Sequence, residues 1–432
     1  MQKFVIRNFG CRASQADGAA LESMLAQKGF EPASEPAAAE LIVLNTCTVT
    51  ANADEDVRQA VRRVHKDNPA ARILVTGCYA QRAPEEIANL PGVAWVVGNS
   101  HKSQIPELVG VPDGVDYHGQ IHVGDIFEQK EFLSAPIEEA AGDRTRPNLK
   151  IQDGCNNRCS FCIIPSVRGR SRSASAERVI EQVRVLSRKY REVVLSGINL
   201  GRWGREPGFG VRLAGLVRQL LDETEIDKIR LSSVEPMDFS DELLELMAGS
   251  GRVCKHVHAP LQSGCDAVLR RMRRKYRPWH YESRIRRARE LMPDAAIGAD
   301  VMTGFPGETD AEFEESRAFI ESLPFTYLHV FTYSERPGTP AAEVREQIPM
   351  ALRRQRTRVL RELADRKNLD FRARMVGRTL DAVTLNERGT AITDNYLKVR
   401  LAREREPNRL VRIEVGGVAE SGVAERTLLP VL

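Results

Sequence analysis

The first 110 residues alternate short apolar runs with longer amphipathic ones. Strand-like runs occur at 3–11, 39–47 and 71–78, and helix-like runs with apolar positions three or four residues apart lie between them at 16–30 and 53–66. Strands separated in this way by helices indicate βαβ units and a parallel sheet. We therefore expect residues 1–112 to form an α/β domain.

The same alternation resumes at residue 149 after a weakly patterned connector at 113–140. It then repeats six times, with strand-like runs at 149–155, 192–199, 229–236, 255–264, 296–308 and 327–336. Six βα units are too few for a closed eightfold barrel, so the pattern predicts a partial (βα)6 TIM-like barrel over 141–370. In such folds the chemistry lies at the C-terminal ends of the strands.

The pattern changes again at the C-terminus, where helices disappear. Short strand-like runs at 379–387, 391–402, 410–419 and 426–432 predict a small antiparallel β-barrel over 371–432. Several basic residues lie along this predicted barrel, namely Lys398, Arg400, Arg403, Arg405 and Arg409. Small β-barrels with basic faces often bind RNA, although a plain accessory domain fits the same pattern.

Composition narrows the class of protein. The chain is 42% hydrophobic and 28% charged, which is typical of folded globular domains, and no run approaches the ~18 apolar residues of a membrane span. The N-terminus shows no signal-peptide pattern, so a cytoplasmic location is expected. In that reducing compartment, the eight cysteines are more often thiols or metal ligands than disulfides.

A basic run extends from Asp266 to Glu290, with ten Lys or Arg against three acids. One interpretation is a solvated helix face. The other is a phosphate-binding surface in which Tyr276, Trp279 and Tyr281 are interleaved with the basic residues.

Three cysteines fall at the ends of predicted N-terminal strands. Cys11, Cys47 and Cys78 each follow one strand-like run. Because ligands bind at the carboxyl edge of open α/β sheets, these three thiols can converge on one point. The sequence therefore predicts a shared metal site, although any one of them could be a small buried core residue.

Three further cysteines, Cys155, Cys159 and Cys162, form a C-x3-C-x2-C motif at the end of the first barrel strand. A structural zinc site would need a fourth thiolate or imidazole, and the next histidine is His256. Three thiolates on a cubane iron–sulfur cluster instead leave one iron without a protein ligand, where a cofactor can chelate.

This motif, with Phe161 before its last cysteine, resembles the signature of the radical S-adenosylmethionine (SAM) superfamily. The resemblance implies a [4Fe-4S] cluster whose open iron binds SAM and reduces it to a 5′-deoxyadenosyl radical. Candidate cofactor-binding residues are Phe161 and the strand-end residues Gly197, Asn199, Ser233, Glu235, Gln262 and Gly304. Arg168, Arg170 and Arg172 are candidates to contact SAM or RNA, or form a solvated turn.

Motifs along nearly the whole chain resemble the methylthiotransferase family, including "NTCTVT", "VTGCYAQ", "PLQSG", "GFPGET" and "TDNYLKV". The resemblance implies an N-terminal three-cysteine domain, a radical SAM barrel and a C-terminal RNA-binding TRAM domain. It also implies a second [4Fe-4S] cluster on Cys11, Cys47 and Cys78. Sulfur attached there is methylated by one SAM, and a radical from a second SAM activates the substrate carbon that takes up the methylthio group.

Family members differ in substrate. The motifs are most similar to the branch that acts on C2 of N6-threonylcarbamoyladenosine at position 37, in the anticodon loop of tRNA, with an external electron donor and a sulfur donor. Alternatives are isopentenyl-adenosine in tRNA, a ribosomal-protein aspartate or, in another class, a non-catalytic electron carrier or RNA-binding protein. Electron carriers normally use four protein ligands per cluster, which disfavours that class.

The chain departs from the family pattern after Cys11. Ser14 and Asp17 stand where asparagine and glutamate are usual, and these positions are expected to order the loop around the second cluster. The two remaining cysteines, Cys254 and Cys265, are expected to be structural thiols.

Overall fold

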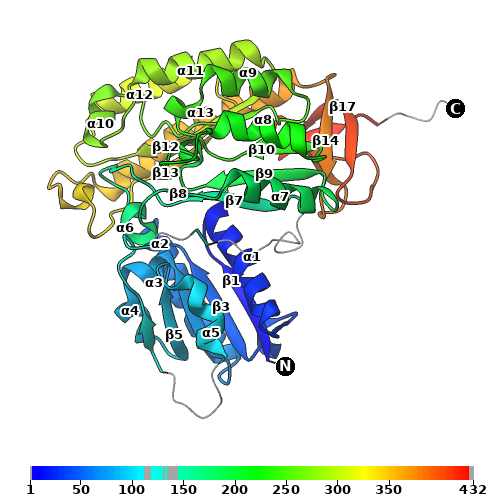
Figure 1. The fold of residues 1–432 in the computed structure, drawn as a ribbon. Coiled ribbons are helices and arrows are strands. Elements are labelled where there is room, and N and C mark those ends of the chain that lie inside the picture. The colour runs from blue at the N-terminus through cyan, green and yellow to red at the C-terminus, as the bar shows by residue number, and fades with distance from the viewer. Residues whose placement is uncertain (1, 111–117, 130–131, 134–144, 428–432) are drawn as a thin grey trace. The chain divides into compact units, whose positions relative to one another are not determined.

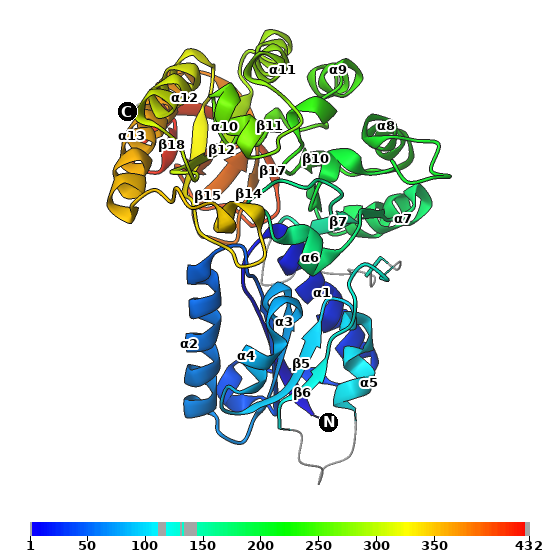
Figure 2. The same cartoon turned by 90° about the vertical axis from the view of Figure 1, so that its left-hand side faces the viewer.

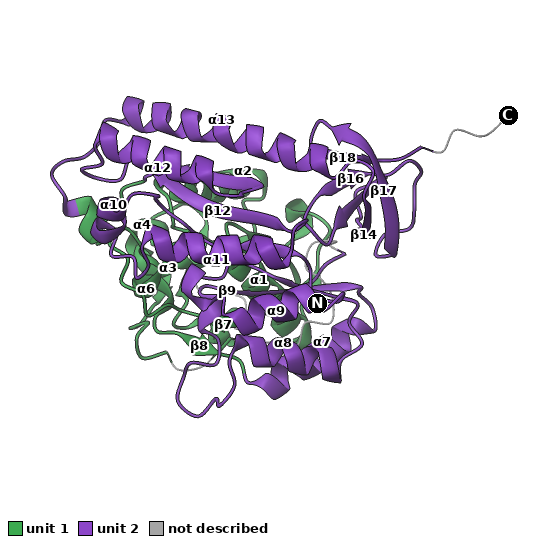
Figure 3. Cartoon of the chain, turned by 90° about the horizontal axis from the view of Figure 1, so that it is seen from above, with its two compact units in different colours: residues 1–141, 148–174, 334–342 green, residues 142–147, 175–333, 343–432 purple. Residues whose placement is uncertain are grey.

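The computed structural model describes residues 2–110, 118–129, 132–133 and 145–427 (Figure 1). The chain divides into two compact units (Figure 3). Unit 1 comprises Met1–Ala141, Asn148–Ala174 and Ser334–Ala342, and unit 2 comprises Gly142–Pro147, Ser175–Tyr333 and Glu343–Leu432. Among the described helices, none has both the length and the apolar character needed to cross a membrane.

Unit 1 contains a six-stranded parallel sheet with the order β2-β1-β3-β4-β5-β6. Its strands are β1 (Lys3–Asn8), β2 (Glu31–Pro32), β3 (Leu41–Thr46), β4 (Arg72–Gly77), β5 (Val93–Gly98) and β6 (Gln120–His122). The three predicted strands are confirmed as β1, β3 and β4, which are neighbours in the sheet. Strand β6 lies within the expected connector. It was not predicted, because a run of three residues is too short to show a strand pattern. Much of that connector lies outside the described residues.

Helices cover both faces of this sheet (Figure 2). The helices are α1 (Arg12–Gln27), α2 (Ala51–Asp67), α3 (Cys78–Arg82), α4 (Pro84–Ala88) and α5 (Ile105–Val109), with short 3-10 turns η1 (Pro36–Ala38) and η2 (Lys102–Gln104). On one face, α1 and α5 pack their apolar side chains on Val43 and Trp95. On the other, α2, α3 and α4 pack on Ile42 and Val75. The βαβ arrangement predicted from the sequence is therefore confirmed.

Unit 1 also holds the segment that carries the C-x3-C-x2-C motif. Strand β7 (Asn148–Asp153) leads into the cysteine loop, and the loop ends in the short helix α6 (Ile164–Arg168). The chain then returns as β8 (Arg172–Ser173), which pairs antiparallel with the end of β7. Both cysteine triads consequently belong to the same compact unit.

Unit 2 continues the βα alternation. Its parallel strands are β9 (Glu192–Gly197), β10 (Lys228–Leu231), β11 (His256–His258), β12 (Ala296–Thr303) and β13 (Tyr327–Thr332). Its helices are α7 (Ala176–Ser187), α8 (Leu213–Glu223), α9 (Asp241–Gly249), α10 (Asp266–Arg271), α11 (Pro278–Leu291), α12 (Asp310–Ser322) and α13 (Met350–Arg374), with turns η3 (Leu200–Arg202), η4 (Pro236–Asp238) and η5 (Pro340–Glu343). Together with β7, these strands confirm the six predicted barrel strands in chain order.

The C-terminal strands of unit 2 form a closed barrel with the order β14-β15-β16-β18-β17. They are β14 (Thr379–Thr384), β15 (Thr390–Thr393), β16 (Lys398–Arg400), β17 (Leu410–Ala419) and β18 (Gly422–Glu425). All pairings are antiparallel except that between β16 and β18. Residues 428–432 of the predicted last strand lie outside the described residues. The expected small β-barrel is thus confirmed.

Candidate active site

The three strand-end cysteines lie at one edge of the unit 1 sheet. Cys11 precedes α1, Cys47 follows β3, and Cys78 begins α3 directly after β4. Gly10, at φ +100°, lies so close to Cys47 that an added Cβ would be 2.5 Å from the Cys47 Cβ and 2.9 Å from its Sγ. Only glycine allows the Cys11 loop to pass this close to Cys47. The Cys11 and Cys47 loops therefore meet at this edge.

The chemistry of these thiols fits an iron–sulfur cluster. Burial, together with negative charge on Cys78 and Cys11, raises the pKa of Cys47 to about 12, so the three sulfurs are within electrostatic reach of one another. A coordinating metal deprotonates such thiols outright. Three soft ligands are the set that a cubane cluster with one open iron requires.

The second cysteine set lies in the loop between β7 and α6. Gly154 has φ +69°, and a Cβ there would lie 2.0 Å from the Arg170 carbonyl oxygen, which shows how tightly the loop closes on itself. The Cys155 backbone N–H donates to the Gly169 carbonyl oxygen at 3.0 Å. Cys155, Cys159, Cys162 and Phe161 are all partly exposed, whereas Cys47 and Cys78 are buried. This loop can therefore meet a soluble cofactor.

Helices α3 and α6 pack against each other and join the two cysteine sets. Cys78, Ile163 and Val167 form one buried apolar cluster. The Asn99 side-chain amide donates to the Val167 carbonyl oxygen at 2.7 Å and lies 3.6 Å from the Cys78 Sγ. Asn99 was not predicted as a site residue. It lies directly after β5, at the same carboxyl edge as the cysteines.

Arg168 is the charged group that links both sets. Its Nε lies 3.3 Å from the Cys78 Sγ, while its other nitrogens donate to Asp153 and Asp17, each at 3.0 Å. Only 2% of Arg168 is exposed. The expectation that Arg168 contacts SAM or RNA is therefore wrong, because its guanidinium is fully engaged inside unit 1. Arg170 remains exposed, and Arg172 donates to the Arg168 carbonyl oxygen at 2.9 Å.

The two departures from the family pattern belong to this buried network. Ser14 accepts from Arg168 at 3.4 Å and lies 3.8 Å from the Cys11 Sγ. Asp17 accepts from Lys102 at 3.0 Å and also pairs with Lys150. Burial alone would raise the pKa of Asp17, but the three neighbouring cations hold it well below its usual range. Asp17 is therefore a carboxylate at neutral pH and orders the Cys11 loop.

In unit 2, the six other candidate SAM-binding residues follow successive strands. Backbone hydrogen bonds between neighbouring strands continue beyond the strand ends. The N–H groups of Ser232, Val234 and Gln262 donate to carbonyl oxygens on the adjacent strands, those of Leu195, His258 and Asp300, respectively. Gly197, Asn199, Ser233, Glu235, Gln262 and Gly304 accordingly lie along one carboxyl edge. Gln262 has φ +67°, a conformation that is uncommon for a side chain other than glycine and that clusters at functional sites.

Two of these residues also have structural roles. Gly304 has φ +71°, and a Cβ there would meet the Arg353 side chain at 2.4 Å. Glu235 pairs with Arg274, which is buried. Packing and ion pairing therefore account in part for a glycine at position 304 and a glutamate at position 235.

Two family models match the chain in the regions that carry these cysteines. The radical SAM superfamily matches residues 149–320, and "Uncharacterized protein family UPF0004" matches residues 3–98. A threonylcarbamoyladenosine tRNA methylthiotransferase, MtaB, of Aquifex aeolicus is 36% identical over 95% of this chain and 99% of its own. The Bacillus subtilis protein of the same name is 36% identical over 92% of this chain and 90% of its own. The chain belongs to the radical SAM tRNA methylthiotransferases.

This methylthiotransferase is also similar to a relative named for another tRNA substrate and to a solved radical SAM structure. A tRNA-2-methylthio-N(6)-dimethylallyladenosine synthase of Pelotomaculum thermopropionicum is 34% identical over 90% of the chain and 88% of its own. A solved structure of the radical SAM methyltransferase TsrM from Kitasatospora setae has a TM-score of 0.57 at 15% identity and covers 79% of this chain and 76% of that one. That similarity supports the fold. As a radical SAM enzyme, the chain uses a [4Fe-4S] cluster and SAM, and its family acts on tRNA.

The basic run of this methylthiotransferase is mainly a solvated, ion-paired surface. Tyr276 and Tyr281 are buried, and their hydroxyls donate to the carbonyl oxygens of Leu261 and Ala259 at 2.7 Å each. The hypothesis that both interleave with phosphate-binding arginines is therefore wrong, and only Trp279 is exposed. Arginines of the run pair with acids on their own or neighbouring helices, as Arg271 does with Glu312 at 2.7 Å.

The basic residues of the C-terminal barrel are partly ion-paired and partly exposed. Lys398 pairs with Glu387 at 2.8 Å, and Arg405 and Arg409 also pair with acidic residues. Arg400 and Arg403 are exposed, and within the described residues neither has an ion pair. These two side chains are available to contact phosphate.

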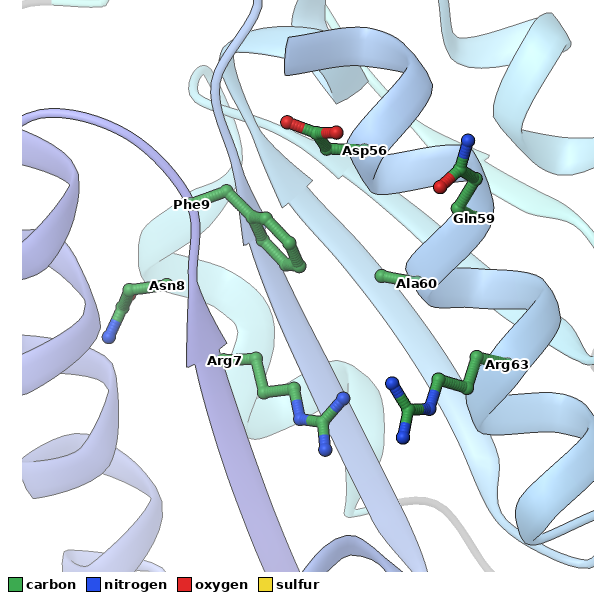
Figure 4. Close-up of a pocket in the computed structure, with 7 residues that line it drawn as sticks. All are labelled: Arg7, Asn8, Phe9, Asp56, Gln59, Ala60 and Arg63. Atoms are coloured by element: carbon green, nitrogen blue, oxygen red, sulfur yellow. The ribbon is translucent and has the colours of Figure 1, made fainter. Parts of the chain in front are cut away.

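A pocket in unit 1 contains none of the predicted site residues. It lies between the end of β1 and helix α2, where Arg7 and Arg63 reach toward each other below Phe9 (Figure 4). The cysteine triads lie outside its lining, so the proposed chemistry does not use it.

The remaining two cysteines behave as structural thiols. Cys254 and Cys265 are each 1% exposed, and burial raises the pKa of Cys254 to about 12 and that of Cys265 to about 11. The Cys265 Sγ donates to Glu315 at 3.0 Å. Both thiols are therefore protonated, and both belong to unit 2.

Proposed function

We propose that the chain transfers a methylthio group to C2 of N6-threonylcarbamoyladenosine at position 37 of tRNA. The observation that carries this substrate is the 36% identity, over 95% of the chain, to a relative named for threonylcarbamoyladenosine. The first four relatives share that name, and the region matched by this chain spans 85% to 99% of the length of each. Isopentenyl-type adenosine is the second candidate, because dimethylallyladenosine synthases are 30% to 34% identical.

Two [4Fe-4S] clusters are part of this proposal. Cys155, Cys159 and Cys162 would hold the cluster that binds SAM, and Cys11, Cys47 and Cys78 would hold the cluster that carries sulfur. When bound, the clusters supply the electron for SAM cleavage and an iron site for the transferred sulfur. The chain's own contribution is to keep three ligands per cluster, to bury Cys47 and Cys78, and to place Arg168 beside Cys78.

The remaining assignments follow from this scheme. Phe161, Gly197, Asn199, Ser233, Glu235, Gln262 and Gly304 would contact SAM, and Arg400 and Arg403 would contact tRNA phosphates. An external reductant and a sulfur donor complete the reaction, because SAM cleavage consumes an electron and each transfer removes one sulfur.

Replacing Cys11, Cys47 and Cys78 together by alanine is expected to abolish methylthio transfer while SAM cleavage persists. The triple variant removes the ligands of the sulfur-carrying cluster but leaves the C-x3-C-x2-C loop unchanged. Liquid chromatography of 5′-deoxyadenosine and of modified nucleosides measures both reactions. Cys265→Ser, which retains a hydrogen-bond donor toward Glu315, is the control and should retain both activities. Methylthio transfer by the triple variant would refute the sulfur-carrying role.

The substrate is tested by mass spectrometry of tRNA nucleosides from cells with and without the gene. We expect the methylthio form of threonylcarbamoyladenosine to disappear and to return when the gene is restored. Restoration with the Cys155, Cys159 and Cys162 triple-alanine variant should fail. If the methylthio form of isopentenyl-adenosine disappears instead, the second candidate is correct.

A further inference from the structure

Three adjacent barrel strands of unit 2 bring two histidines and one aspartate together. His258 Nε2 lies 3.2 Å from Asp300 Oδ1, and His329 Nδ1 lies 3.1 Å from the same oxygen. Among the described residues, this is the one group of three His, Cys or acidic side chains whose ligand atoms all lie within 4.8 Å of one another. None of the three belongs to the cysteine sites or to the expected SAM contacts.

Strand register explains why these side chains meet. In the parallel sheet, His258 of β11 is opposite Gly298 of β12, and Gly298 is opposite Tyr327 of β13. Two residues further along, Asp300 is opposite His329. Because side chains two residues apart share one face of a strand, His258, Asp300, Tyr327 and His329 all lie on the same face. Gly298 makes room for the Tyr327 ring, since a Cβ there would lie 1.9 Å from it.

A second layer of hydrogen bonds orients His258. The Tyr327 hydroxyl lies 2.8 Å from His258 Nδ1 and 2.7 Å from His256 Nε2. If the hydroxyl donates to His256, it accepts from a protonated Nδ1 of His258, which leaves the His258 Nε2 lone pair directed at the Asp300 side. Metal-binding histidines are typically held in this way through their other nitrogen.

We propose that His258 Nε2, Asp300 Oδ1 and His329 Nδ1 bind a divalent first-row transition-metal ion such as Zn²⁺. Metal–ligand bonds of about 2.0–2.2 Å in a tetrahedral site place neighbouring ligand atoms about 3.3–3.6 Å apart, and the observed 3.2 and 3.1 Å are slightly shorter. Two imidazoles and one carboxylate are a ligand set that zinc and ferrous iron share. Three protein ligands leave at least one position for water or an oxygen of a substrate.

Access also suits a metal. The His329 side chain is 52% exposed, which gives an ion a path to the site. Tyr327 and His256 are further titratable groups on this face, and the Tyr327 hydroxyl hydrogen-bonds to both His256 and His258.

The test uses the full-length enzyme with its clusters reconstituted anaerobically and then dialysed against chelator-buffered zinc. Mass spectrometry of the elements measures zinc and iron per chain for the wild type, His329→Ala and His280→Ala. His280 is an exposed histidine of α11 and serves as the matched control. We expect about one zinc more per chain in the wild type and His280→Ala than in His329→Ala, with iron equal in all three.

Zinc bound adventitiously to cysteines would be equal in the wild type and in His329→Ala. That result would overturn the proposal and leave a hydrogen-bonded polar cluster only. Because His329 is exposed, its loss should not unfold the protein, and equal iron content checks this. Tyr327→Phe, which removes the hydroxyl that hydrogen-bonds to His258 and His256, is expected to weaken zinc binding by about 10- to 100-fold. Unchanged zinc affinity in Tyr327→Phe would contradict the proposed orienting role.

Discussion

Replacing Cys155, Cys159 and Cys162 together by alanine is expected to abolish reductive cleavage of SAM and to lower the iron content from about eight atoms per chain to about four. The three thiols occupy one partly exposed loop between β7 and α6. The remaining cysteines are not replacements, because Cys254 and Cys265 are buried in unit 2 and Cys11, Cys47 and Cys78 are the proposed ligands of the other cluster. The open iron that binds SAM therefore disappears with these ligands.

Anaerobic reconstitution followed by iron and sulfide analysis measures the first effect, and formation of 5′-deoxyadenosine under dithionite measures the second. Cys265→Ser is again the matched control, with both values expected at the wild-type level. The single variants Cys155→Ala, Cys159→Ala and Cys162→Ala should each behave like the triple variant, since two thiolates hold a cubane cluster poorly. Undiminished 5′-deoxyadenosine formation by the triple variant would refute the radical SAM assignment of this loop.

The positions of the cysteines in the fold were predictable because two local rules act together. A parallel sheet places the carboxyl ends of its strands at one edge, so Cys11, Cys47 and Cys78 could be placed from strand position alone. The order β1-β3-β4 then makes their strands direct neighbours. Likewise, the C-x3-C-x2-C spacing is contained in one loop and needs no knowledge of distant contacts.

Residues whose role depends on distant partners were not predictable in this way. Arg168 was expected at the surface, but its partner Asp17 is 151 positions away in the chain. Nothing local to "RGRSR" reveals that pairing. Strand β6 and Asn99 were missed for a similar reason, because a short strand and a single amide carry no periodic signal.

The error at Tyr281 was different, because the sequence held the information. Tyr281, Ile285 and Ala288 are spaced by four and three residues and form the buried stripe of α11. The many arginines around these positions led instead to the prediction that the aromatic side chains lie on an exposed basic surface. Helical period is therefore a better guide to aromatic burial than the charge of neighbouring residues.

Arg168→Met is expected to destabilise unit 1 strongly, because it leaves two buried carboxylates without one of their counter-charges. Asp17 and Asp153 are 2% and 5% exposed, and removing one partner of a buried ion pair costs about 3–5 kcal/mol. Denaturant unfolding measures the loss. Arg168→Lys keeps the charge but lacks the planar fork that reaches Asp17, Asp153 and Cys78 together, so we expect an intermediate loss.

The pH dependence of stability should change in the same variant. Burial would raise the pKa values of Asp17 and Asp153, but the surrounding cations lower both below their unfolded values. Their stabilising contribution is therefore complete above the unfolded pKa of about 4 and is lost as the pH falls through the acid range. Arg168→Met reduces that shift, so its stability should fall less steeply on acidification. An unchanged acid slope would contradict this electrostatic role.

Arg168 should also set the reduction potential of the proposed cluster on Cys78. Lys102, Lys150 and Arg168 outnumber the carboxylates of Asp17 and Asp153 in the buried network, and the Arg168 Nε lies 3.3 Å from the Cys78 sulfur. A cubane core bearing three thiolates is negatively charged, so this excess of positive charge favours the reduced cluster. Removing the guanidinium should lower the potential, while Arg168→Lys should lower it less. Redox titration monitored by electron paramagnetic resonance, in a background that lacks Cys155, Cys159 and Cys162, isolates this cluster, and an unchanged potential would show that Arg168 acts through packing alone.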